Sequence, residues 1–476
     1  MGLAVLVCTS IVGNSFGMTV KAADIAEIPS TEVESVYDLP VDSNAIQGWP
    51  QGPQIYSESG IVMDMDSGAI LYAKKIDDKH YPASITKVMT ALVALQNYEM
   101  DETVSFTWDD VGFLEYGDAH IGIKPEEEVG MEDCMYGMLL ASANEVSHAI
   151  GAHMEGGYDE FLRVMNETAK ELGCQNSNWM NTHGLHDPEH YTSCRDMALI
   201  GSAVFQYDKF REITNTYQHT IPFTNITNET RTFQQNHDMI KDWSSRYYEY
   251  CVGGKTGYTD QALTTLVTFA TKKDANQEDV NLVAVVMRTH GGGGNAYIDT
   301  RAILDYAFNN FSKVKVTEDA VRNVNESEKI AEKISEMEEG AYIMLPNGIS
   351  LESIEQKTDA EFQKPVELGD KTGEITYMYG TTPVGSAKVT ITEEFHDEIH
   401  GIKDIQIEEN EKKSGENKLE IGFILKIIII IFAAAVIGFF VFLRYISYKR
   451  KMMRKRRRKR RMQQKKTKQL IKKRNN

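Results

Sequence analysis

Cysteine is scarce in this chain, with five residues among 476. None of the five belongs to a CxxC pair or to the cysteine and histidine spacing of a zinc site, which argues against a cysteine-ligated metal centre. Internal repeats are absent too, which excludes a solenoid. Hydrophobic residues make up 42% and charged residues 25%, so the chain can bury a core, and its length predicts more than one domain.

Acidic residues are missing altogether from the C-terminal end. Residues 444–476 hold 18 lysines and arginines and no aspartate or glutamate, so the other residues carry 51 − 18 = 33 basic against 69 acidic groups, a net charge of −36. Such polarisation within one chain indicates two different compartments.

A hydrophobic run separates these two parts. Residues 421–443 read IGFILKIIIIIFAAAVIGFFVFL, with Lys426 as the one charge. Twenty-three helical residues are long enough to cross a bilayer, and the basic residues that follow mark the cytoplasmic side. We therefore expect a single transmembrane helix, with the chain before it outside the cell. The basic tail could also bind nucleic acid, but its position beside the span favours topology and contact with anionic lipids.

The N-terminal end agrees with an exported protein. Residues 1–22 contain the apolar run LAVLVCTSIVG and end in Val-Lys-Ala, which resembles a signal-peptide cleavage site. Four cysteines then remain in the predicted exported part, and the sequence does not say whether or how they pair. They are Cys134, Cys174, Cys194 and Cys251.

Hydrophobic periodicity divides the rest into segments. Residues 23–53 are polar and acidic and are interpreted as a linker, whereas residues 54–312 begin with a hairpin pattern, continue with helical patterns and end with two apolar strands and a helix. This order predicts an α/β (α+β) domain whose N- and C-terminal strands share one sheet. Residues 314–394 have short strands between turn signals and are interpreted as a small all-β domain, followed by a charged tether at 395–420.

Three short motifs carry the candidate chemistry. Ser84 and Lys87 in PASITK are three residues apart, so they lie on one face of a helix whose start Pro82 marks. A serine hydroxyl needs a base to become a nucleophile, and a lysine of lowered pKa can be that base. The second motif is Ser142 with Asn144, a hydroxyl that can relay a proton and an amide that can hold a peptide.

The third motif, Lys-Thr-Gly, occurs twice. Lys255, Thr256 and Gly257 precede two apolar strands and are expected at an edge of the main sheet, where an ammonium and a hydroxyl can hold a carboxylate. The second copy, at 371–373, lies in the predicted all-β domain. We expect only the first copy to share a pocket with Ser84.

Together the three motifs resemble those of serine penicillin-recognising enzymes. The surrounding segments YPASITKVMTALVAL, LLASANEVSHAI and GGKTGYTDQALTTLVTFA are similar to those of D-alanyl-D-alanine carboxypeptidases, the low-molecular-mass penicillin-binding proteins. The resemblance covers about residues 55–311 and implies a β-lactamase/transpeptidase-like catalytic fold. It implies a bacterial cell-wall enzyme that removes the terminal D-Ala from peptidoglycan stem pentapeptides, is acylated by β-lactams and needs no cofactor.

The resemblance also implies roles for the matching residues. Ser84 would be acylated, Lys87 would be the base and Ser142 would shuttle protons. Asn144 would bind the peptide, Lys255 and Thr256 would hold its terminal carboxylate, and the backbone N–H groups of Ser84 and Tyr258 would form the oxyanion hole. Glu145 departs from the aspartate of many relatives, and the span and basic tail differ from the surface-lying anchor of some relatives.

Three alternatives are open. A β-lactamase of class A would carry a Glu-x-x-Leu-Asn segment between the second and third motifs, and residues 145–255 have none. A receptor that is acylated by penicillin and signals through the span would explain the tail, which has no recognisable output domain. His183, His186, Asp187 and His190 could form a metal cluster, but HExxH is absent and the segment resembles a metal-free loop of the carboxypeptidases.

Overall fold

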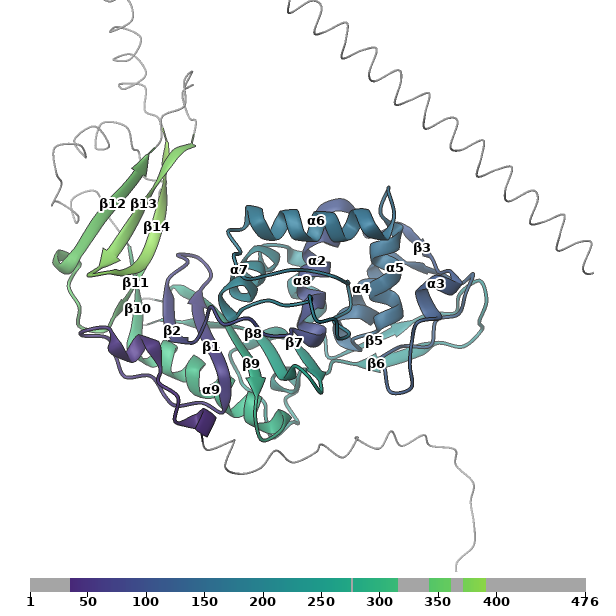
Figure 1. Ribbon diagram of the computed structural model, residues 1–476, viewed down its shortest axis with the longest axis horizontal. Coiled ribbons are helices and arrows are strands. Elements are labelled where there is room, and N and C mark those ends of the chain that lie inside the picture. Colours follow the sequence, from purple (N-terminus) through teal and green to yellow (C-terminus); the bar gives the residue numbers. More distant parts are fainter. Residues whose placement is uncertain (1–34, 275–276, 316–341, 361–370, 391–476) are drawn as a thin grey trace, which may run out of the picture. The chain divides into compact units, whose positions relative to one another are not determined.

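A five-stranded antiparallel sheet organises the protein (Figure 1). The computed structural model describes residues 35–274, 277–315, 342–360 and 371–390. The strand order is β2-β1-β9-β8-β7. The strands are β1 (Ser57–Asp64), β2 (Ile70–Lys74), β7 (Cys251–Thr259), β8 (Leu263–Lys273) and β9 (Asp279–Thr289).

Strands from both ends of the predicted catalytic domain meet in this sheet, as the sequence predicted. Ser57 of β1 pairs with Thr289 of β9, and the two side-chain oxygens lie 2.7 Å apart. The β1–β2 hairpin turns at Ser67, whose backbone N–H and hydroxyl both donate to the Asp64 carboxylate. Gly68 follows with a φ of +72°, a conformation that glycine adopts without strain.

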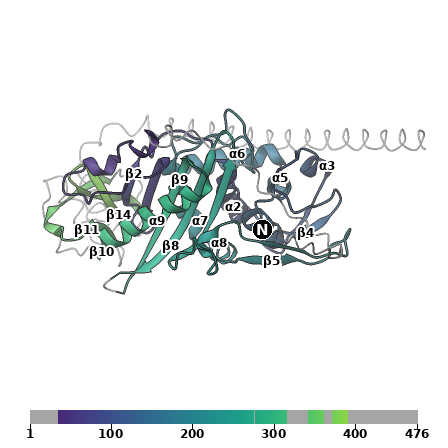
Figure 2. The same ribbon diagram turned by 90° about the horizontal axis from the view of Figure 1, so that it is seen from below.

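Helices cover both faces of the sheet (Figures 1 and 2). The alternation of β9 explains this, because Val283, Val285 and other odd-numbered residues join the main hydrophobic core, which includes α7. On the opposite face, Tyr306 of α9 packs against Tyr72 of β2. The helices are α2 (Thr86–Asn97), α3 (Trp108–Val111), α4 (Met131–Leu140), α5 (Asn144–His153), α6 (Tyr158–Glu171), α7 (Cys194–Phe205), α8 (Asp208–Thr214) and α9 (Gly293–Asn310).

Short elements complete this region. The strand pairs are β3 (Thr103–Ser105) with β4 (Glu128–Gly130) and β5 (Gln218–Ile221) with β6 (Arg231–Gln234), and the 3-10 turns are η1 (Asp42–Ala45), η2 (Ala83–Ile85) and η3 (Asp238–Ile240). The four cysteines of the described residues, Cys134, Cys174, Cys194 and Cys251, are free thiols.

The segment 35–53 differs from the predicted linker. Trp49 is 4% exposed, and its indole N–H donates to the Leu71 carbonyl at 3.0 Å. The buried Lys74 ammonium donates to the carbonyls of Val36 and Ile55. The prediction is therefore wrong for these residues, since the few apolar side chains of this polar segment are enough to fix it to the domain.

The described residues after α9 form strands and one 3-10 turn. Strand β10 (Phe311–Lys315) pairs with β11 (Tyr342–Pro346). After η5 (Leu351–Ser353), a three-stranded antiparallel sheet contains β12 (Ile354–Ala360), β13 (Lys371–Tyr379) and β14 (Thr382–Thr390). These strands agree with the predicted β-structure, whereas a separate domain with the boundaries 314–394 stays a prediction.

Several sequence predictions lie outside the described residues. They are the signal peptide at 1–22, the tether at 395–420, the span at 421–443 and the tail at 444–476. Within the described ranges, none of the helices combines the length and the apolarity that a membrane crossing requires.

Candidate active site

Ser84 lies in the tight turn η2, directly before α2. The preceding Ala83 has a φ of +50°, and its carbonyl accepts a hydrogen bond from the Thr86 hydroxyl at 2.8 Å. Pro82 is anchored from the sheet, because the Thr265 hydroxyl donates to its carbonyl at 2.8 Å. The turn therefore holds Ser84 from two sides and leaves it partly exposed at the edge of a pocket.

Lys87 lies one helical turn after Ser84 and is completely buried. Its Nζ lies 3.2 Å from Ser84 Oγ, 2.7 Å from Asn144 Oδ1 and 2.6 Å from the carbonyl oxygen of His183. Burial lowers the pKa of Lys87 well below its usual value, and the nearby charge of Lys255 lowers it further. Burial therefore shifts the amine beside the serine toward its neutral form.

A second serine and lysine face this pair. Ser142 adopts a φ of +63° in the short connection between α4 and α5, and its Oγ accepts from Lys255 Nζ at 3.0 Å. The same ammonium donates to the Thr256 carbonyl at 2.8 Å. Lys255 is 1% exposed, and this burial lowers its pKa to about 7. Both lysine amines therefore make their hydrogen bonds to residues of the site itself.

The connection that carries Ser142 is fixed by buried groups. The backbone N–H of Asn144 donates to the Ala119 carbonyl at 2.8 Å. Glu145 is fully buried and accepts from the N–H of Ile121 at 2.7 Å, and burial raises the pKa of its carboxyl group. Glu145, which departs from the family pattern, therefore links the segment that carries Ser142 to the loop around Ile121.

The first Lys-Thr-Gly copy lies within β7, at the edge of the main sheet. A Cβ atom added to Gly257 would lie 2.9 Å from the backbone nitrogen of Ser84 and 3.0 Å from the Pro82 carbonyl oxygen. Only a glycine lets the strand approach the serine turn this closely. The second copy begins β13, in a different sheet, so the first copy is the one beside Ser84, as predicted.

Sequence reasoning missed part of the pocket beside Ser84. Besides Ser84, Ser142, Thr256, Gly257 and Tyr258, the lining includes Asn236, Asp238, Arg246 and Tyr297. Arg246 donates to the Asp238 carboxylate at 2.7 Å and lies over the Tyr297 ring at 4.8 Å. These residues come from η3, from the loop segments on either side of it and from α9, and no motif marks them. The one sequence signal that could have indicated Arg246 is a positive charge among aromatic residues shortly before β7.

The histidine-rich loop lies behind the site. His190 accepts from the Met180 N–H at Nδ1, and its Nε2 lies 2.8 Å from the Thr86 hydroxyl. His183 stacks on Phe113 and gives its carbonyl oxygen to Lys87. Among the residues with described positions, no three histidine, cysteine or acidic side chains gather as metal ligands would. The contacts of His183 and His190 are those of a loop that supports Lys87 and η2.

Comparison with known proteins gives a consistent result. Residues 47–291 match the D-alanyl-D-alanine carboxypeptidase family, peptidase S11. The chain is 28% identical over 353 residues to the D-alanyl-D-alanine carboxypeptidase DacA of Haemophilus influenzae, covering 71% of this chain and 85% of that protein. It is 30% identical over 220 residues to DacF of Bacillus subtilis, covering 45% of this chain and 54% of that protein.

A solved structure supports the same fold. Penicillin binding protein 5 from Haemophilus influenzae aligns with a TM-score of 0.56 at 25% sequence identity. The alignment covers 72% of this chain and 99% of that structure. The chain is therefore similar in sequence and in fold to penicillin-binding carboxypeptidases.

Proposed function

The chain belongs to the D-alanyl-D-alanine carboxypeptidase family and is a serine-type carboxypeptidase, and we propose that it works through an acyl-enzyme on Ser84. Its substrate is the stem pentapeptide of peptidoglycan, from which it removes the terminal D-Ala. The contact between the buried Lys87 amine and Ser84 carries this proposal.

A neutral Lys87 suits the role of general base. Its two N–H groups can donate to the oxygens of Asn144 and His183, at 2.7 and 2.6 Å, which leaves the nitrogen lone pair for the Ser84 hydroxyl. A protonated amine would have no lone pair to accept the proton. The lowered pKa of Lys87 is thus the property that the reaction needs.

Acylation follows from this arrangement. Lys87 takes the Ser84 proton, and Oγ attacks the carbonyl carbon of the penultimate D-Ala. The backbone N–H groups of Ser84 and Tyr258 stabilise the oxyanion. The proton passes from Lys87 through the Ser142 hydroxyl to the leaving amine, the peptide bond breaks and the terminal D-Ala departs.

Water completes the cycle. It loses a proton to Lys87 and attacks the acyl carbonyl, and Ser84 Oγ leaves with that proton. In a β-lactam the leaving nitrogen stays tethered to the acyl group. We therefore propose that penicillin acylates the same serine and that its acyl-enzyme persists.

The substrate backbone pairs with β7, whose outer edge has no neighbouring strand among the described residues. Its terminal carboxylate lies toward Thr256 and Arg246, which line the pocket, rather than toward Lys255 as the family resemblance implied, because Lys255 is buried and is not part of this lining. Arg246 is 42% exposed at its side chain and lines the pocket, so it can reach a bound carboxylate.

We also propose that residues 421–443 anchor the enzyme as a single membrane span, with the catalytic domain outside and residues 444–476 in the cytoplasm. The support is the sequence alone, namely an apolar run of 23 residues followed by a tail that is basic throughout. The basic tail would then contact anionic lipid headgroups.

Two measurements on the exported part test the enzymatic proposal. A peptide ending in D-Ala-D-Ala should release D-Ala, and labelled penicillin should attach to Ser84 as located by mass spectrometry. The Ser84→Ala variant should do neither. Release of D-Ala by Ser84→Ala at the wild-type rate would refute the acyl-enzyme.

A further inference from the structure

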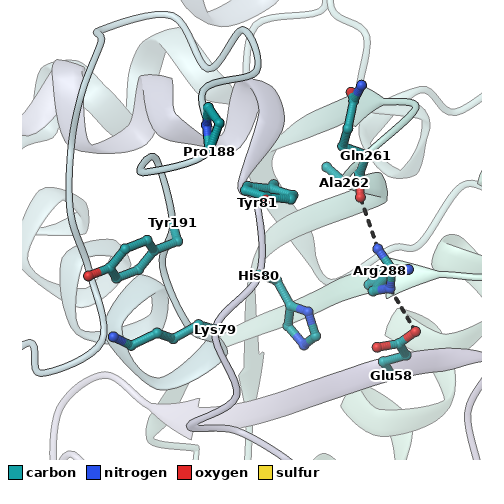
Figure 3. A pocket seen from close by; sticks show the side chains of 9 residues that line it. All are labelled: Glu58, Lys79, His80, Tyr81, Pro188, Tyr191, Gln261, Ala262 and Arg288. Atoms are coloured by element: carbon teal, nitrogen blue, oxygen red, sulfur yellow. Dashed lines mark hydrogen bonds and ion pairs between the residues drawn. The ribbon is translucent and has the colours of Figure 1, made fainter.

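A second pocket lies next to the serine turn, separate from the one that Ser84 lines (Figure 3). Lys79 and Tyr191 are on one side of it, and Gln261 and Arg288 are on the other. Tyr81 lies between these two sides. Neither the mechanism nor the family resemblance gives this pocket a task.

Two chain segments connect the second pocket to the active site. Tyr81 lines the second pocket and is three residues before Ser84. On the opposite wall, Gln261 lines the second pocket and is three residues after Tyr258, which lines the first. Both segments therefore run from one pocket to the other within a few residues of chain.

The direction of the bound peptide follows from β7. If the terminal carboxylate lies toward Thr256 and the scissile carbonyl lies at Ser84 and Tyr258, the preceding residues continue toward Gln261. The peptide then runs antiparallel to β7, and the third residue before the scissile bond reaches the second pocket.

The charges of the lining residues determine which kind of ligand the second pocket can bind. Arg288 donates to the Glu58 carboxylate at 2.7 Å and to the Gln261 carbonyl at 2.9 Å, which fixes its guanidinium in place. Burial opposes ionisation of Glu58, but hydrogen bonds from His290 and Arg288 outweigh it and lower the pKa of that carboxyl group to about 2. This ion pair is neutral as a whole.

Lys79 adds an uncompensated positive charge. Its ammonium lies 4.3 Å from the centre of the Tyr191 ring, and no carboxylate pairs with it among the described residues. Burial lowers the pKa of His80, which keeps that ring neutral. The lining therefore carries a net charge of +1, from Lys79.

We propose that the second pocket is a subsite for the upstream part of the stem peptide, and that Lys79 binds a carboxylate carried by the third residue before the scissile bond. This inference rests on the proposed function. It makes the enzyme selective for an acidic peptide over a shorter or amidated one.

Three substrates test the subsite with the exported part of the protein. The first is a pentapeptide that ends in D-Ala-D-Ala and carries a free carboxylate on the third residue before the scissile bond. The second is the same peptide with that carboxylate amidated, and the third is an acetylated tripeptide too short to reach the pocket. The Lys79→Ala variant should raise KM for the acidic pentapeptide about threefold to fivefold, the size of an exposed ion pair, with kcat unchanged.

The other two substrates decide the interpretation. Their KM values should be the same in Lys79→Ala as in the wild type. The control variant Lys170→Ala, which removes an exposed lysine of α6, should leave the KM values of all three substrates unchanged. An equal KM rise for the acidic and amidated peptides, or no rise at all, overturns the subsite. Failure of the wild type to cleave even the tripeptide would instead refute the proposed function, and the subsite with it.

Discussion

At the scale of single residues, the burial of two lysines sets the protonation properties of the site. Lys87 and Lys255 are almost inaccessible to water, and each has backbone or side-chain oxygens around its amine. A buried ammonium is costly, so burial lowers both pKa values. A charged Lys255 in turn opposes protonation of Lys87.

The lowered pKa of Lys255 predicts a pH-dependent stability. An unfolded lysine titrates near 10.5 and the folded Lys255 near 7, so between these pH values the unfolded state binds more protons. The buried Lys255 therefore destabilises the folded state by an amount that depends on pH. This destabilisation is absent above about pH 10.5, grows as pH falls and levels off below about pH 7. We expect the free energy of unfolding of the wild type, relative to Lys255→Met, to fall by a few kcal/mol from pH 10 to pH 7, at about 1.4 kcal/mol for each pKa unit.

Denaturant unfolding of both proteins across this pH range measures that difference. The contributions of titrating groups far from Lys255 are common to the two proteins and cancel, whereas Lys87, whose pKa the charge of Lys255 lowers, adds to the difference. Parallel stability profiles would mean that Lys255 keeps an ordinary pKa in the folded protein.

The sequence located the motif residues but could not find all of their partners. Ser84 and Lys87 lie within hydrogen-bonding distance, as their spacing of three residues predicted, whereas the hydrogen bond from Lys87 to Asn144, 57 positions away, was not predicted. The interaction of Lys255 with Ser142 was not foreseen, since the two residues are 113 positions apart. Arg246 was missed because it lies in a loop, where no hydrophobic periodicity predicts which way a side chain points.

Packing of β7 against η2 is the contact between elements on which the proposed oxyanion hole depends. An Ala at position 257 would place a methyl group against backbone atoms of Ser84 and Pro82, which cannot move as a flexible side chain can. We expect Gly257→Ala to slow acylation by penicillin by about 100-fold, since a displacement of about 1 Å is enough for such a loss. The rate of labelled-penicillin attachment measures this.

The second Lys-Thr-Gly copy offers a matched control. Gly373→Ala makes the same change in β13, in a sheet that does not contain β7. Its acylation rate should remain within about twofold of the wild type. A wild-type rate for Gly257→Ala would show that the close approach of β7 and η2 is not needed for acylation.

Another prediction concerns the N-terminal segment, which the sequence suggested to be a linker. Trp49 is buried against Phe311, with ring centres 5.0 Å apart. Trp49→Ala should lower the free energy of unfolding by about 3–5 kcal/mol, as removal of a buried tryptophan does. Trp108→Ala removes a side chain that is 70% exposed and should change stability by less than about 0.5 kcal/mol. Equal denaturation midpoints for the two variants would contradict this role.

At the scale of the whole molecule, the shared sheet was predictable because a hairpin pattern opens the catalytic region and two strands with a helix close it. The packed segment at 35–53 was not, since its three buried hydrophobic side chains, Val36, Val41 and Trp49, have no periodic spacing. Boundaries in the β-rich part were equally hard to place, because β10 follows α9 without a break and pairs with β11 across 26 intervening residues.

Membrane attachment is the prediction that belongs to the whole chain. The full-length protein should sediment with membranes, and deletion of residues 421–476 should release it without loss of penicillin acylation. Deletion of residues 444–476 alone should leave it attached, since the apolar run remains. Recovery of the full-length protein in the soluble fraction would refute the span.

The pairing of Ser57 with Thr289 across 232 residues has a consequence for biosynthesis. Strands β1 and β9 are neighbours in the sheet, so a nascent chain cannot close it until the ribosome has added residue 289. Contacts between such distant residues also slow folding, because a long loop must be ordered before they form. Strand β7, which lies against the Ser84 turn, joins β1 only through β8 and β9, so we expect the proposed nucleophile to obtain its full surroundings late in translation. An incomplete chain that lacks β9 cannot complete the sheet, and a chain in this state suits the export that the sequence predicts.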